Sequence, residues 1–265
     1  MQNRLQQQAA VAELGQKALA SNDSQTLLDD AVLMVARTLG VDLCEILEFD
    51  EQTQTLLVRA GVGWKEGVIG VAHLGLGDAS QAGYALQSAE PVVVEDMRAE
   101  ERFHTSELLA DQRVVSGMSV VIPGGPHPYG VFGIHTKNRR IFTEDDTNFI
   151  ISVANILAAS IERKRMEDAL RILNQDLDRK VNERTALVRL LQEVTIAANE
   201  AETISEAMRV ALEKISKFTG FPVGHVFVSV RENAKGLVSS PIWYFDHSHP
   251  MRLCEKPPIG LNLPG

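Results

Sequence analysis

The feature that most limits what this chain can fold into is a long segment without helix breakers. Neither glycine nor proline occurs between Thr147 and Gly220. Because these two residues are the ones that most often end a helix, the segment predicts one continuous helix that runs towards Asn199, about 50 residues in all. A single globular domain does not contain so long a rod, so we expect the helix to connect separate modules.

Hydrophobic residues recur along this helix at intervals of three, four and seven, and most other positions are charged or polar. This spacing is typical of a coiled-coil seam. The irregular step at Arg184 predicts a stutter, where the supercoiling changes locally. A leucine stripe of this length needs a partner, so we expect a parallel homodimer; the alternative is a helix that packs on its own domain. The seam residues are Met166, Leu170, Leu173, Leu177, Val181, Val188 and Leu191.

The first 160 residues combine helical and β-type segments. Residues 6–19 and 27–39 have helical composition or spacing, and Gly40 ends the second of these helices. Runs of β-type residues at 43–50 and 55–61, and at 114–122 and 129–136, predict two hairpins, with a further strand at 91–95.

Two connections in the same region have clear signals. Residues 61–83 are rich in glycine and indicate a long ordered loop, and a short helical piece is expected around Leu108. Thr143, followed by Glu144, Asp145 and Asp146, predicts the start of the long helix. Together these elements predict an α+β fold in which helices pack on an antiparallel sheet.

Shifting the sequence by 180 residues reveals an internal repeat. Residues 37–43 fall over residues 217–223, and in both places a helix end leads into a β-rich run. A capping box at 203–206 opens the helix of the second copy. Such self-similarity predicts tandem domains of one fold. We expect a sensory domain at 1–160, a coiled-coil linker at 161–198, and the N-terminal half of a second domain at 199–265.

Charge and hydropathy restrict the partners. The formal net charge is −9, which disfavours non-specific binding to nucleic acid or to anionic membranes. No apolar run is long enough to span a bilayer and no signal peptide is visible, so a cytoplasmic protein is expected. Cys44 and Cys254 have neither the number nor the spacing of a disulfide framework or a zinc site.

Catalytic motifs are missing from the sequence. It contains no phosphate-binding Gly-Lys-Ser/Thr loop, no nucleophile elbow and no His/Glu metal spacing. We therefore expect this part of the protein not to be an enzyme.

Three segments carry a family resemblance. The stretch SQAGYALQSAEPVVVEDMRAEERF, the hairpin that begins VVSGMSVVIPGGPHPYGVFGIHT and the helix that follows it resemble a bacterial GAF domain over about residues 15–165. The segment LNQDLDRKVNERTALVRLL is similar to linkers that join such sensors to histidine kinases, and residues 200–265 resemble the start of another GAF domain. The resemblance implies an antiparallel sheet of five or six strands, the first and last helices on one face, and a small-molecule pocket on the other.

The pocket lining is carried over by fold position. The candidates are Tyr84, Asp96, Arg102, Phe103, His104, Ser116, Met118 and Ser119. Arg102 and Asp96 have the alternative of a structural ion pair. No covalent bilin is expected, because Cys44 is on the first strand and Cys254 is in the partial copy. His104 could ligate haem, but we favour an exposed loop histidine, and the ligand itself stays unknown.

Two functions are compatible with these features. The first is the sensory input module of a signal-transduction protein, with a sensor histidine kinase as the expected parent and an effector domain beyond Gly265. A diguanylate cyclase or a phosphatase is the alternative effector. The second function is a ligand-free dimerisation scaffold, and the sequence leaves both open.

Overall fold

Six antiparallel strands form the sheet around which the first part of the molecule is built. The computed structural model describes residues 2–21, 23–76, 80–229 and 237–246, which fall into two units, 1–171 and 172–265. The order of strands across the sheet is β3-β2-β1-β6-β5-β4. Their bounds are β1 Leu43–Asp50, β2 Thr55–Val62, β3 His73–Gly75, β4 Val92–Val94, β5 Ser116–Ile122 and β6 Gly130–Thr136.

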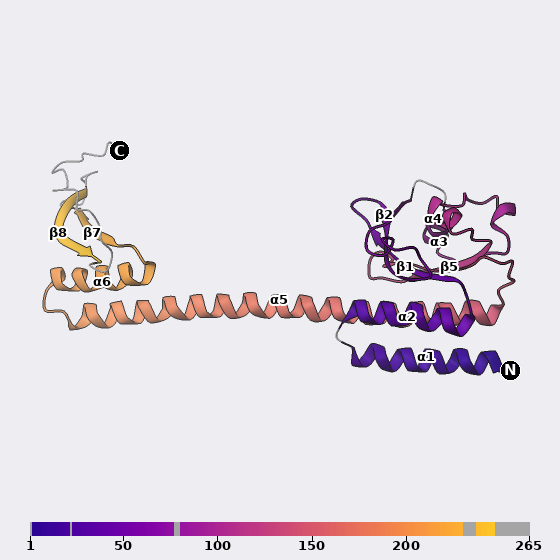
Figure 1. Cartoon of the computed structure of the whole chain (residues 1–265). Coiled ribbons are helices and arrows are strands. Elements are labelled where there is room, and N and C mark those ends of the chain that lie inside the picture. The colour runs from indigo at the N-terminus through magenta and orange to yellow at the C-terminus, as the bar shows by residue number, and fades with distance from the viewer. Residues whose placement is uncertain (1, 22, 77–79, 230–236, 247–265) are drawn as a thin grey trace. The chain divides into compact units, whose positions relative to one another are not determined.

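Helices cover both faces of this sheet. On one side lie α1 (Gln2–Ala20), α2 (Ser24–Leu39) and the first turns of α5 (Glu144–Glu200); on the other lie α3 (Gln81–Ser88) and α4 (Glu107–Asp111), with a short 3-10 turn at Met97–Ala99 (Figure 1). The predicted α+β fold, with the first and last helices on one face, is confirmed.

The alternation of side chains along the strands divides the interior into two cores. On β1, Cys44 and Ile46 pack against α1, α2 and α5. Leu43 and Leu47 point the other way and pack with residues of α3, β4 and α4. Strand β1 therefore contributes to both cores at once.

The helix ends follow their capping signals. Asp23 accepts hydrogen bonds from the backbone of Gln25 and Thr26 at the start of α2, and Gly40 ends α2 in the left-handed conformation. At the start of α5, the Thr143 hydroxyl accepts from the Asp146 backbone N–H at 3.2 Å, and the Thr143 N–H donates to Asp146 at 3.1 Å. The predicted end of α2 at Gly40 and the predicted start of α5 after Thr143 are confirmed.

The glycine-rich stretch differs from its prediction. Residues 61–83 were expected to be one long loop, but the structure has the short strand β3 within it and begins α3 at Gln81. Ser80 caps this helix by accepting from the Gly83 N–H at 3.1 Å. Gly83 inside the helix hides the helical signal, because glycine has a low helix propensity.

Polar contacts fasten α5 to α1 and to the connection that follows β6. The buried side chain of Gln7 donates to Asp146 at 2.8 Å. Farther along, Arg163 donates to the Ala18 carbonyl at 2.7 Å, near the C-terminal end of α1. Arg140 donates to the Leu39 carbonyl at 2.6 Å. The base of the long helix is thus held within the first unit.

The second unit contains the rest of α5, then α6 (Ile204–Thr219), β7 (Val223–Ser229) and β8 (Leu237–Phe245). Helix α6 has the length of α2 and lies 180 residues later, and Gly220 ends it in the left-handed conformation as Gly40 ends α2. The two strands pair antiparallel, as β1 and β2 do. The order of elements at 204–245 thus repeats the order at 24–62.

Candidate ligand-binding site

A small, partly enclosed cavity lies between the sheet and the helices α3 and α4. Its walls include Glu45, Leu47, Gln81, Leu109, Ser119 and His135. The space open to the centre of a water molecule is about 10 Å³. That volume holds about one water molecule. The cavity is on the face of the sheet where the sequence predicts a small-molecule pocket.

A buried hydrogen-bonded pair, Glu45 and His135, forms one wall. Glu45 is 4% exposed and His135 is 1% exposed. The His135 Nε2 atom lies 2.7 Å from Glu45 Oε1. An ionised carboxylate can only accept, so in that state the imidazole nitrogen donates this hydrogen bond. The side chains come from neighbouring strands, because Glu45 is opposite Gly133 and His135 is opposite Leu43 in the β1–β6 register.

Two glycines make room for this pair. A Cβ atom on Gly133 would lie 2.2 Å from Glu45 Oε1, and one on Gly117 would lie 2.4 Å from His135 Nδ1. Both distances are far inside van der Waals contact. The glycines at these strand positions therefore have a packing reason, namely the close approach of a polar pair.

Three polar atoms of the cavity walls lack hydrogen-bond partners. Within the described part of the chain these are Glu45 Oε2, Gln81 Oε1 and His135 Nδ1. Gln81 is 1% exposed and is oriented by its amide nitrogen, which donates to the Val92 carbonyl at 3.2 Å. Nearly all buried polar groups in folded proteins have a partner. Three such atoms on the walls of one cavity therefore point to an occupant.

Trp64 lies beside His135, next to the buried pair. Its indole Nε1 donates to the Cys44 carbonyl at 3.1 Å, and its ring meets the His135 ring edge-on with centroids 6.4 Å apart. Burial, with a smaller contribution from Glu45, raises the pKa of the Cys44 thiol well above its usual value. A thiol in this state is a packing residue.

An open cleft adjoins the cavity. It has a volume of about 820 Å³ and shares Leu74, Ser80, Ser106 and Leu108 with the cavity walls. Glu107 also lines this cleft. The shared residues show that the cavity and the solvent-facing cleft border each other.

Five of the predicted pocket residues lie on this side of the sheet. Ser119 lines the cavity, and His104 is an exposed residue of the outer cleft. The rings of Tyr84 and Phe103 have centroids 5.7 Å apart. The Arg102 guanidinium lies 5.7 Å from the Tyr84 centroid and 5.6 Å from the Phe103 centroid. Tyr84, Phe103 and Arg102 thus form a cluster that does not line the cavity.

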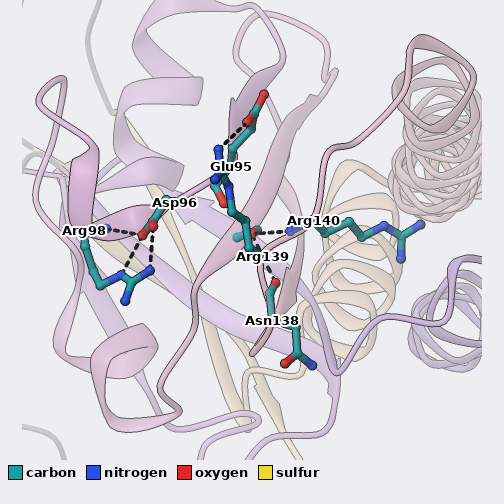
Figure 2. A network of polar contacts seen from close by, with 7 residues as sticks. Glu95, Asp96, Arg98, Asn138, Arg139 and Arg140 are labelled. Carbon is teal, nitrogen blue, oxygen red and sulfur yellow. Dashed lines mark hydrogen bonds and ion pairs between the residues drawn. The ribbon is translucent and has the colours of Figure 1, made fainter.

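Asp96 and Ser116 instead belong to a polar network that joins the connection after β4 to the connection after β6 (Figure 2). The Ser116 hydroxyl donates to the Glu95 carbonyl at 2.6 Å and accepts from the Arg140 N–H at 2.8 Å. Glu95 and Arg139 are linked at 3.3 Å. Ser116 is therefore committed to the fold.

The alternative ion pair between Arg102 and Asp96 is wrong. Figure 2 shows Asp96 turned towards Arg98, which donates from Nη2 at 2.6 Å. Arg102 instead binds Glu100, with Nη2 2.7 Å from Oε2. In both pairs the arginine lies two residues after the acid. A local turn brings together residues that are two positions apart. Asp96 and Arg102 are six positions apart, so each pairs with a nearer residue instead.

Met118 lies on the opposite face of the sheet from the other candidates. It is fully buried in the core formed with α1, α2 and α5. The reason is strand alternation, which puts Ser119 on the cavity side and Met118 on the other. Met118 therefore does not line the cavity; fold position alone did not separate the two faces of the strand.

The sequence interpretation missed the residues that form the polar wall. Glu45 interrupts the apolar run Leu43–Leu47, and Gly117 and Gly133 interrupt two neighbouring strands. A charged residue inside a buried strand, together with glycines on strands beside it, is a signal that could have indicated the pair. His135 is a buried residue that meets Glu45 across the strands.

The seven seam residues of α5 form an exposed apolar row. Each of them exposes more than half of its surface in the single chain. The row begins after Ile161, the last buried residue of α5.

In the described part of the chain no helix has both the length and the hydropathy of a membrane-spanning segment. Nor do these residues contain a His, Cys, Asp or Glu cluster suited to a metal ion. Cys254 lies outside the described residues.

The chain resembles known proteins both in sequence and in structure. The sequence model of the family described as GAF domain matches residues 23–161. The GAF domain of a phosphoenolpyruvate-protein phosphotransferase from Coxiella burnetii is similar, with a TM-score of 0.58 and 19% identity, over 63% of this chain and 99% of that one. The corresponding Acinetobacter domain has a TM-score of 0.54 and 24% identity, over 62% and 97%.

A third similar structure is a free methionine-R-sulfoxide reductase from Neisseria meningitidis in complex with its substrate. Its TM-score is 0.53 and its identity 17%, over 61% of this chain and 91% of that one. No curated protein matches the sequence. At these identities the likeness to the three structures is one of fold.

Proposed function

The chain belongs to the GAF domain family through residues 23–161, and we propose that it is the sensory input region of a bacterial sensor histidine kinase. GAF domains are regulatory sensory modules of signalling proteins. A methyl-accepting chemotaxis protein is also among the similar structures, at a TM-score of 0.53 and 20% identity. The linker resemblance at 173–191 favours the kinase over other effectors. In this proposal the protein acts in the cytoplasm, and its effector lies beyond Gly265.

One observation carries the proposal: a single helix contains both a buried and an exposed apolar surface. Phe149, Val153 and Leu157 of α5 are buried against the sheet. Later in the same helix, Leu173 and Leu177 are exposed. A rearrangement at the sheet can therefore bias the exposed part without any intervening loop. Ligand binding then acts by shifting the populations of two helix arrangements.

The exposed row is the surface through which we propose that two chains pair. Leucine and valine side chains at coiled-coil spacing pack into a partner helix and leave water. A second copy of this chain is the partner that needs no further component. Residues 199–265 are then the start of a second GAF domain in each chain, which the repeated order of elements supports.

Sedimentation equilibrium of the 265-residue chain tests the pairing. We expect a dimer for the unchanged protein and a monomer for Leu173→Glu, since a charge in the seam faces its own copy. Ile172→Glu is the matched control, because Ile172 is equally exposed but lies off the seam. A strict monomer of the unchanged chain at high micromolar concentration would contradict the coiled coil.

Transmission needs a separate experiment in the parent protein. Leu177→Pro breaks the helix, at a cost of about 3 kcal/mol in helix stability, and leaves the first unit folded. We expect it to abolish the response of the effector to the input. An unchanged response would show that α5 does not carry the signal.

The size of the cavity favours a second candidate function. A space for about one water molecule suits a ligand-free dimerisation scaffold better than a sensor of a bulky ligand. Native mass spectrometry of protein purified from its host separates the two. A bound small molecule supports the sensor, whereas a dimer without one supports the scaffold.

A further inference from the structure

We propose that the small cavity beside Glu45 and His135 receives the ammonium head group of a small alkylamine or diamine. This inference rests on the sensory function proposed above and names the class of ligand. The three unpartnered side-chain atoms carry it.

The hydrogen-bonding capacities match. Glu45 Oε2 and Gln81 Oε1 are acceptors, and Gln81 cannot be turned round without losing its bond to the Val92 carbonyl. With Nε2 donating to Glu45, a neutral His135 imidazole offers Nδ1 as a third acceptor. A primary ammonium group has three N–H donors. A water molecule has only two, and an anion would meet the Glu45 carboxylate.

The size of the cavity restricts the head group. Room for about one water molecule also admits one ammonium nitrogen, but not a branched or aromatic group. The body of the ligand must therefore lie in the adjoining cleft of about 820 Å³. Leu74 and Leu108, which border both spaces, offer apolar contact to a methylene chain.

The charge of the cleft agrees with this class. Glu107 is an exposed residue of the cleft, and so is Asp111, which also pairs with Lys65 at 3.4 Å. A second ammonium group at the far end of a diamine meets these carboxylates. An amino acid is a poorer fit, because its carboxylate is one carbon away from the nitrogen and would lie close to Glu45.

Isothermal titration calorimetry of the 265-residue chain tests the proposal with four probes. We expect saturable binding of n-butylamine and 1,4-diaminobutane. Tetramethylammonium has the same charge but no N–H donor, so it should not bind, and alanine should bind more weakly than n-butylamine. Equal binding of tetramethylammonium, tighter binding of alanine, or no saturable heat from either amine would overturn the proposal. The last result indicates a structural water.

Variants locate the site. Glu45→Gln removes the charged acceptor and should weaken amine binding about tenfold or more. Glu48→Gln is the control on the same strand, because Glu48 pairs with Arg59 at 3.1 Å and lies outside the cavity. If Glu45→Gln does not fold, Gln81→Met on α3 decides the question. Unchanged affinity in the folded variant would refute the assignment.

The failure of this inference and that of the proposed function give different results. Dimerisation and transmission through α5 do not depend on which ligand the cavity takes. A dimer that responds in its parent protein but ignores amines overturns only the ligand class. A monomer that binds amines overturns only the output route.

Discussion

Gly133→Ala tests the packing around the buried pair. The added Cβ would lie 2.2 Å from Glu45 Oε1 and 2.8 Å from Glu45 Cδ. To relieve this contact the carboxylate must move by about 1 Å or more, since carbon and oxygen atoms pack at well over 3 Å. Glu45 is 4% exposed and packed on most sides, so the movement separates it from His135, now 2.7 Å away.

The magnitude follows from three contributions. Replacing glycine in a strand by alanine would by itself stabilise the protein by about 0.5–1 kcal/mol. Overpacking a filled core costs about 1–3 kcal/mol. Weakening a buried hydrogen bond to a charged group costs about 1–3 kcal/mol more. The costs prevail, and we expect a net loss of about 3 kcal/mol in the free energy of unfolding.

Urea unfolding followed by tryptophan fluorescence measures this loss. The chain has two tryptophans, Trp64 in the first unit and Trp243 in the second. A Trp243→Phe background makes Trp64 the reporter of the unit that contains the pair. The urea dependence should stay constant while the midpoint falls. If Gly133→Ala is as stable as its parent, the Glu45–His135 pair is not held in the arrangement described.

Three further changes have expected outcomes. Gly15→Ala in α1 places its Cβ in open space and should raise the free energy of unfolding by about 0.5–1 kcal/mol in the same urea assay; a loss would indicate a hidden contact. Asp23→Ala removes the cap of α2 and should cost about 1 kcal/mol, whereas an unchanged midpoint would show that another group caps the helix. Hydrogen bonds from Arg102 lower the pKa of Glu100 from 4.5 to about 2, so its contribution is complete above pH 4.5 and is lost as the pH falls towards 2. Glu100→Gln should flatten the pH dependence of stability in that window, and an unaltered slope would exclude this pair as its source.

Local signals in the sequence predicted most of the fold. Gly40 and Thr143 act within a few residues of where they stand, through backbone conformation and capping, so their effects can be read without the tertiary structure. Helix α3 was not predicted because it is short and contains Gly83, whose low helix propensity outweighed the capping serine at position 80.

The candidate site was harder to predict, because its chemistry depends on register. Glu45 and His135 are 90 residues apart and meet only through the pairing of β1 with β6. Met118 and Ser119 are adjacent in sequence but lie on opposite faces of the sheet. Without the strand directions and register, fold position alone selected the right neighbourhood but not the side chains that form its polar wall.

Strand alternation in the first unit puts the cavity on one face of the sheet and the contacts to α2 and α5 on the other. Along β1, Glu45 and Leu47 form the cavity, whereas Cys44 and Ile46 support the helices. Under the proposed function, substitutions at the cavity-facing positions of β1 would change ligand specificity and leave the helix-facing positions unchanged. Related domains can then differ in the ligand they bind and keep the same helix-facing surface. A designer can use the same division by randomising one face of the sheet and leaving its reverse untouched.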